Sequence, residues 1–251
     1  MLIPLDYRSE QVLEEHERIW APLRPGWRWP RRHPLTAEYS WVCDRLAEHL
    51  QCRPNEARVM DAGGGQGSMQ HYLAEHYRMA WNVDVDPLCI HGQTSEALLL
   101  KADLENLGSV PSLIPGTFDG IVAVSSIEHN PWRKILRIVR ELLGMLREGA
   151  PLVVTVPAFE HRTYYPPGGW PDPWQAWPEC YLFDGDAFRE LVQSVEDVSD
   201  LVGPAILDGE FYRREWRWLH ADARENSPVE CRRPYLSLGF VLRRRTGNVE
   251  D

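Results

Sequence analysis

The chain has 251 residues, of which 43% are hydrophobic, and a formal net charge of −10. This length suits one well-buried α/β core with accessory structure and is short for two independent domains. The acidic balance argues against a nucleic-acid partner, because affinity for a phosphate backbone comes from clustered Lys and Arg.

The sequence shows no basic-then-apolar leader and no apolar run near the ~18 residues that span a bilayer. Its five cysteines are scattered and form no C-x-x-C pair, which favours reduced thiols over disulfides or a zinc site. We therefore expect a cytoplasmic protein with no membrane partner and no bound metal.

Residues 1–54 have the pattern of a helical N-terminal cap. Apolar residues recur at helical spacing in segments 9–19 and 36–50, which predicts two helices. Four prolines in segment 21–34 predict an irregular strap between them. The tryptophans of this region either cover a cofactor cleft or simply pack the cap onto the core, and the pattern leaves both readings open.

A glycine-rich turn follows the first predicted strand, residues 58–62, and precedes a helical pattern over residues 66–77. The turn reads Asp61-Ala62-Gly63-Gly64-Gly65-Gln66-Gly67. Alternate glycines adopt backbone angles closed to other residues, and without a Cβ they let a ligand approach the main chain. The helix N-terminus behind them favours ligand oxygens. A tight loop without a ligand is the alternative.

The spacing acid-x-Gly-x-Gly-x-Gly resembles the first motif of the class I S-adenosylmethionine (SAM)-dependent methyltransferases, particularly those acting on small molecules. Asp61, Gly63, Gly65 and Gly67 match it at every defined position. The resemblance implies SAM as cofactor, with these four residues at its binding site. It also implies an α/β Rossmann-like three-layer sandwich over residues 55–245, with a seven-stranded, mostly parallel sheet of order 3-2-1-4-5-7-6.

Two further acids lie at the end of the second predicted strand and just after the third. By the same resemblance, Asp84, with Val85 beside it, binds the ribose, since a carboxylate can accept from two neighbouring hydroxyls at once. Asp103 would accept from the adenine amino group, and Leu104 would offer a backbone N–H to the ring. A strand-end turn at Asp84 and a helix N-cap at Asp103 are the structural alternatives.

The segment 118–129 begins as a buried central strand and ends with Ser125-Ser126-Ile127-Glu128-His129. This ending is similar to the hydrophobic-Glu-His that lines the methyl-transfer chamber in many small-molecule methyltransferases. The resemblance places Ser125 at the cofactor and makes His129 the first candidate for a general base, with Glu128 beside it. His129 could instead only bond loop backbone or shape the chamber.

Segment 157–183 is rich in Trp, Tyr, Pro and Gly and has little regular pattern. A connection of this length is typical of a functional lid, so we expect an acceptor-binding lid with His161 as a further catalytic candidate. Its rings suit an aromatic, apolar or amine acceptor. Alternatively, they pack against the N-terminal strap or a partner subunit.

The other expected elements complete the core. Helices are expected at 131–146 and 184–192, whereas 211–234 resists assignment. The remaining strands are expected at 79–85, 97–101, 118–124, 151–156, 196–202 and, antiparallel, 236–243.

The sequence thus predicts a metal-independent SAM-dependent methyltransferase, monomeric or homodimeric, acting on an oxygen or nitrogen of a small molecule. Three rival functions remain. A nicotinamide-dependent dehydrogenase fits less well, because its fingerprint would place the third glycine at Ser68. A protein or nucleic-acid methyltransferase would share the cofactor half. A non-catalytic relative would bind the cofactor in a structural or regulatory role.

Overall fold

A computed structural model describes residues 3–5, 34–65, 67, 69–86, 96–158, 162–165, 180–207 and 236–246. Several predicted features lie outside these ranges: the first helix (9–19), the strap apart from its last residue, the segment 211–234, and most of the aromatic lid.

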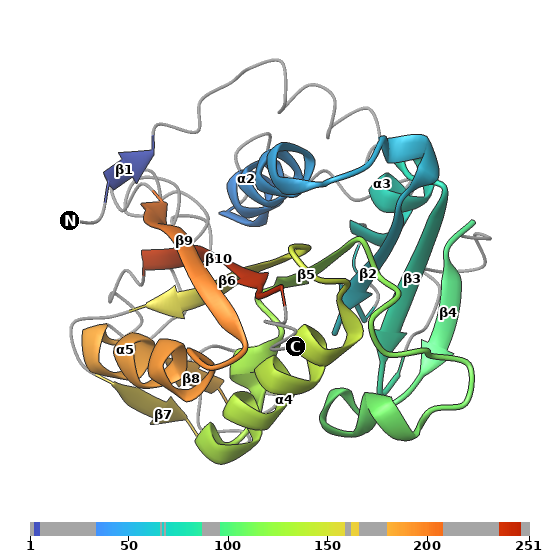
Figure 1. The fold of residues 1–251 in the computed structure, drawn as a ribbon. Helices are drawn as coiled ribbons and strands as arrows, with labels where there is room; N and C mark the ends of the chain where they lie inside the picture. The colour runs from blue at the N-terminus through green and yellow to red at the C-terminus, as the bar shows by residue number, and fades with distance from the viewer. Residues whose placement is uncertain are drawn as a thin grey trace, which may run out of the picture.

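An eight-stranded sheet forms the middle layer of the protein (Figure 1). Its spatial order is β1 (Ile3–Leu5), β9 (Ser199–Leu207), β10 (Leu236–Arg244), β6 (Pro151–Ala158), β5 (Gly120–Val124), β2 (Arg58–Ala62), β3 (Met79–Asp84) and β4 (Leu98–Lys101). The five neighbouring strands β4, β3, β2, β5 and β6 pair in parallel, and β10 is antiparallel to both of its neighbours, β6 and β9. The seven predicted strands follow the expected order, which confirms the Rossmann-like fold. The eighth, β1, was not predicted and extends the edge beside β9.

Helices cover both faces of this sheet (Figure 1). On one face lie α2 (Pro34–His49) and α3 (Met69–His76), and on the other lie α4 (Trp132–Met145) and α5 (Gly185–Ser194). In the described part of the chain, short 3-10 helices connect the elements: η1 (Pro54–Glu56), η2 (Leu104–Ser109) and η3 (Ile127–His129). None of the helices in the described ranges is long and apolar enough to cross a membrane.

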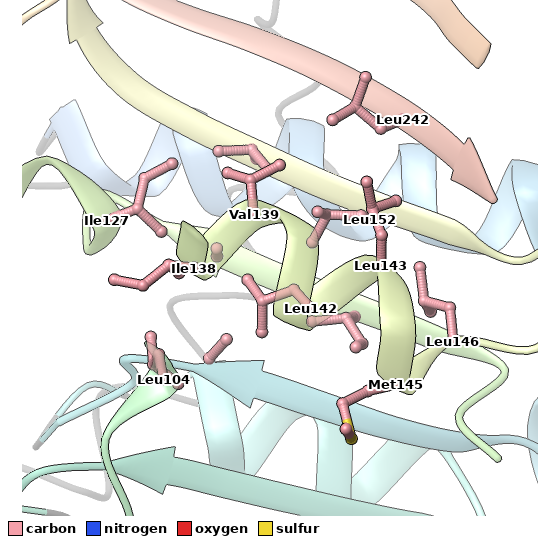
Figure 2. Packing of buried hydrophobic residues seen from close by; sticks show 14 of the residues in the cluster. Leu104, Ile127, Ile138, Val139, Leu142, Leu143, Met145, Leu146, Leu152 and Leu242 are labelled. Carbon is pink, nitrogen blue, oxygen red and sulfur yellow. The ribbon is translucent and has the colours of Figure 1, made fainter. Parts of the chain in front are cut away.

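Helix α4 is the centre of the larger hydrophobic cluster. Its apolar residues recur at the predicted helical spacing and are buried against the sheet. Figure 2 shows this packing, with Leu104 from η2, Ile127 from η3, Leu152 from β6 and Leu242 from β10 around the helix. The strand residues alternate between the two faces, so that Ile121 joins this cluster while Val122 faces α2.

Two glycines let α2 approach the opposite face closely. A Cβ added at Gly239 of β10 would lie 2.8 Å from the ring of Trp41, and one at Gly120 of β5 would lie 2.4 Å from Leu46. Trp41 and Leu46 are fully buried. Of the two readings left open for the N-terminal tryptophans, packing against the core therefore holds for Trp41.

The stretch expected to be an irregular lid contains regular structure at its ends. Strand β6 continues to Ala158, beyond the predicted end at 156. The strands β7 (Thr163–Tyr165) and β8 (Cys180–Leu182) pair antiparallel, and the rings of Tyr164 and Tyr181 lie 4.8 Å apart across them. Such cross-strand aromatic pairs stabilise two-stranded sheets. The sequence did not predict these strands, because three residues are too few to show the alternation of a strand.

The contact between Gly239 and Trp41 predicts the effect of a single added methyl group. Gly239→Ala should lower the free energy of unfolding by about 1–3 kcal/mol, because the Cβ overpacks a rigid ring. Gly144→Ala is the matched control: nothing lies within 4 Å of its added Cβ, and alanine in a helix should stabilise by about 0.5–1 kcal/mol. Urea unfolding of both variants measures the difference, and equal stabilities would contradict this packing account.

Candidate functional site

The carboxyl ends of β2, β3 and β5 bring the main predicted site residues together. Strand β2 lies between β3 and β5, so the chain connections leave it in opposite directions at this point. Ligands of open parallel sheets bind outside the strand ends at such a switch point. Ser126, which follows β5, donates its hydroxyl to the carbonyl of Ala62 in β2 at 2.8 Å and thereby holds the two strand ends side by side.

The glycine turn needs the absence of side chains at two positions. Gly63 has φ +73°, and a Cβ there would lie 2.7 Å from the Cβ of Ser126. At Gly64, which the motif leaves undefined, a Cβ would lie 2.3 Å from Asp61 Oδ2. Gly65 also has positive φ, at +48°. The turn therefore packs closely against Ser126, which follows β5, and against Asp61 of its own motif.

Asp84 holds this turn from the end of β3. Its Oδ2 accepts from the backbone N–H of Gly65 at 3.1 Å, and its Oδ1 accepts from the N–H of Asp86 at 2.8 Å. A carboxylate has about four acceptor sites, so capacity remains for hydroxyl donors. The neighbouring Val85 is 59% exposed, a large apolar side chain placed where it can cover a bound group.

Asp61 is buried beneath the turn, and its Oδ2 has no hydrogen-bond partner. The pKa of this carboxyl is raised to about 7. Burial is the largest cause, the nearby charge of Asp84 adds to it, and a hydrogen bond from the backbone N–H of Gln70 partly opposes the shift. An acid in this environment binds a proton or a cationic donor readily.

Two polar residues beneath the turn were missed from the sequence. Asn82 of β3 lies opposite Asp61 in register and donates to the carbonyl of Gly65 at 2.9 Å, while its Oδ1 has no partner. Gln70 of α3 is fully buried and donates to the carbonyl of Gly67 at 2.8 Å. A polar residue inside the apolar strand Met79–Asp84 was the signal for Asn82.

Asp103 takes the helix N-cap role that was the structural alternative for it. Its Oδ1 accepts from the N–H of Glu105 at 3.1 Å, and its Oδ2 accepts from Lys134 Nζ at 2.9 Å. Partial burial raises the pKa of Asp103, but the hydrogen bonds from Lys134 and Glu105 outweigh this and lower it. Leu104 is buried within the core, 3.6 Å from where a Cβ of Gly63 would lie.

Ser125 connects the cofactor side of the site to α2. Its φ is +43°, a strained conformation for a residue with a side chain, and such strain concentrates at functional sites. Its hydroxyl donates to Glu38 Oε2 at 2.7 Å, and Thr155 of β6 donates to the same oxygen at 2.9 Å. Glu38 and Thr155 were not predicted; a charged residue at 38 beside the apolar stripe of the helix was the available signal.

The catalytic candidates Glu128 and His129 lie together in η3, and His161 lies outside the described residues. Glu128 is 2% exposed, and its Oε1 is 3.8 Å from His129 Nε2. Burial, together with the charge of Glu38, raises the pKa of Glu128 well above its usual range, against its own backbone N–H. In the described ranges, no three His, Cys, Asp or Glu side chains gather as a metal site.

The pKa of Asp61 predicts how folding stability depends on pH. Because the folded-state pKa of about 7 exceeds the ordinary 3.8, the bound proton stabilises the fold fully below pH 3.8 and progressively less up to about pH 7. Asp61→Asn removes this dependence. The free energy of unfolding of the wild type, minus that of the variant, should fall by up to about 1.4 kcal/mol per pH unit across this window. Urea titrations without ligand measure it, and parallel pH profiles would refute the assignment.

Comparison with known proteins agrees with this geometry. Residues 32–195, more than half of the chain, match the family model described as a methyltransferase domain. No curated protein matches the chain significantly.

Among solved structures, a 1,6-didemethyltoxoflavin-N1-methyltransferase from Burkholderia thailandensis, with bound 1,6-didemethyltoxoflavin and S-adenosylhomocysteine, has a TM-score of 0.56 at 15% identity, covering 98% of this chain and 93% of that one. A putative sarcosine dimethylglycine methyltransferase from Galdieria sulphuraria has a TM-score of 0.59 at 13% identity, with coverages of 94% and 98%. The [4+2]-cyclase SpnF has a TM-score of 0.59 at 14% identity, with coverages of 98% and 98%. These likenesses show the fold, and the family match shows that the chain belongs to the methyltransferase domain family, as a class I SAM-dependent methyltransferase.

Proposed function

We propose that this protein transfers the methyl group of SAM to an oxygen or nitrogen of a small-molecule acceptor. The observation that carries the proposal is the Asp84 carboxylate, which holds the glycine turn and keeps acceptor capacity beside the exposed Val85. When bound, SAM supplies a methyl group already activated by its positive sulfur. The protein's contribution is then chiefly to position the acceptor and to exclude water.

The residues present fit the cofactor. Asp84 would bind the ribose hydroxyls, and Gly63 and Gly65 would let the cofactor lie against the main chain. The unpartnered Oδ2 of Asp61 would favour a positively charged donor near the turn. Asp103 already accepts from Lys134 and Glu105, so an adenine amino group would be a third partner for it.

The acceptor side is proposed at the ends of β5 and β6. Ser125 and η3 follow β5, Thr155 of β6 accepts from the N–H of Ser125, and β8 packs against both β6 and η3. Two of the similar structures are named for small-molecule acceptors, which supports this class. The net charge of −10 counts against a nucleic-acid acceptor. We further propose residues 55–245 as the catalytic core and 1–54 as its cap.

His129 is the proposed general base for an acceptor that enters protonated. Its ring lies next to the Glu128 carboxyl, and an imidazole so placed can take a proton from a substrate and pass it on. Loss of such a base should lower turnover and leave cofactor affinity unchanged. The turnover of His129→Ala and the affinity of this variant for S-adenosylhomocysteine should therefore be measured together. A loss of both would indicate that His129 shapes the site instead.

Binding and transfer need separate tests, because the similar fold of a [4+2]-cyclase shows that the architecture also serves other chemistry. A relative that only binds the cofactor would show affinity for S-adenosylhomocysteine and no methyl transfer to any acceptor.

Removal of the Asp84 carboxylate tests the cofactor site. Asp84→Ala should weaken binding of S-adenosylhomocysteine at least about tenfold, because two hydroxyl donors lose a charged acceptor. Asp86→Ala is the matched control, since Asp86 is exposed and its backbone N–H still reaches Asp84; its affinity should stay within about twofold of the wild type. Isothermal titration measures both, and equal affinities in the wild type and Asp84→Ala would contradict the assignment.

A further inference from the structure

Two buried carboxyl groups come together on the proposed acceptor side of the site. Glu38 comes from α2, on one face of the sheet, and Glu128 comes from η3, after β5. Each is only 2% exposed. Glu38 accepts a hydrogen bond from Ser125, three positions before Glu128, and another from Thr155 of β6, so α2 brings Glu38 to the segment that carries Glu128. The charge of Glu38 also raises the pKa of Glu128, although burial raises it more.

The two carboxyl groups are held differently. Glu38 Oε2 accepts from the hydroxyls of both Ser125 and Thr155, which fixes this oxygen between the residue after β5 and the middle of β6. Glu128 Oε2 is buried and has no hydrogen-bond partner. Within the described ranges, the side chain at ion-pair distance from Glu128 is the His129 ring, whose Nε2 lies 3.8 Å from Oε1. A buried polar atom without a partner is costly, and it commonly marks a position that a ligand satisfies.

The pair lies apart from the proposed cofactor residues. Asp61 and Asp84 lie at the carboxyl ends of β2 and β3, and Asp103 follows β4. Glu38 instead contacts the residue after β5 and the middle of β6, and Glu128 lies in η3 after β5, on the other side of β2 in the sheet. Only Ser125 takes part in both groups. The unpartnered oxygen of Glu128 therefore belongs to the side where an acceptor would bind.

We propose that the acceptor is an amine whose protonated nitrogen binds between Glu38 and Glu128. This inference rests on the proposed methyl-transfer function and names its substrate class. An ammonium group supplies several N–H donors and a positive charge, which suit the unpartnered Oε2 of Glu128 and offset the repulsion between two buried carboxylates. A carboxylate acceptor would add a third negative charge to the same buried region.

The same pair accounts for activation of the amine. An ammonium nitrogen has no lone pair, so it must lose a proton before it can accept a methyl group. The unpartnered, buried oxygen of Glu128 can take that proton first, and His129, the proposed general base, lies 3.8 Å from the same carboxyl group and can receive it from there. The nitrogen lone pair then forms the N–C bond as the C–S bond breaks, and the electron pair of that bond stays on sulfur. The positive charge moves from sulfur to nitrogen, and the proton passes to solvent.

Small ligands matched in shape test the binding site without knowledge of the natural acceptor. Isopropylammonium chloride is titrated into the full-length protein, with and without S-adenosylhomocysteine, and isopropanol serves as the neutral counterpart at equal ionic strength. Thermal unfolding reports binding. The ammonium ligand should raise the Tm of the wild type, and isopropanol should not.

Charge-neutral variants assign the binding to the pair. Glu128→Gln and Glu38→Gln should each weaken ammonium binding at least about tenfold. Glu148→Gln, at an exposed position in the turn before β6, should respond like the wild type. Both site variants should keep the wild-type affinity for S-adenosylhomocysteine, which shows that they fold.

The outcomes distinguish failure of the amine proposal from failure of the proposed methyl-transfer function. If the wild type gives no ammonium response, or if its response survives in both site variants, the amine proposal is wrong, whatever the cofactor affinity. If the ammonium response behaves as expected while S-adenosylhomocysteine fails to bind the wild type, the carboxyl pair stands as an ammonium site and the methyl-transfer function is wrong.

Discussion

The close approach of the glycine turn to the strand ends is the constraint on which the rest of the site depends. Gly63 lies against Ser126, and Gly64 lies against Asp61, at distances that leave no room for a Cβ. The polar groups around the turn then fix its position: Asp84 accepts from it, and Asn82 donates to it. A backbone held in this way presents its main chain to a ligand at little cost in ordering upon binding.

Helix α2 links the fold to the proposed chemistry. Its apolar side chains fill the space above glycines in β5 and β10, which fixes its height over the sheet. At that height, Glu38 reaches the hydroxyls of Ser125, after β5, and Thr155, within β6. The hydroxyl of Tyr39 lies 3.2 Å from the Cβ position of Gly67. The family match also begins before this helix, at residue 32. Helix α2 therefore packs beside the glycine turn and supplies one member of the carboxyl pair.

The sequence predicted those parts of the molecule that local pattern controls. Apolar runs located the seven strands, and the stripe of α4 located the central helix, because burial imposes a period on each. The family resemblance singled out Asp61 in the glycine motif and Asp84 at the end of the next strand, and the structure places both carboxyl groups beside the turn; their contacts with a cofactor stay a prediction. Glu38, Asn82 and Thr155 were missed because their roles arise from contacts between distant elements. Asp103 caps η2 by accepting from the N–H of Glu105, and it also pairs with Lys134, 31 positions away. The contact with Lys134 arises only in the folded chain, so residue type and position alone could not show how the carboxylate is used. Strand β1 has only three residues, too few for a periodic signal.

The most direct test of the central claim is isothermal titration of the purified, ligand-free protein with SAM, S-adenosylhomocysteine and NAD in parallel. The account predicts binding of both sulfur-containing ligands with dissociation constants on the order of micromolar, a free energy of about −8 kcal/mol, and no binding of NAD. Binding of NAD alone, or of none of the three by folded protein, would contradict it.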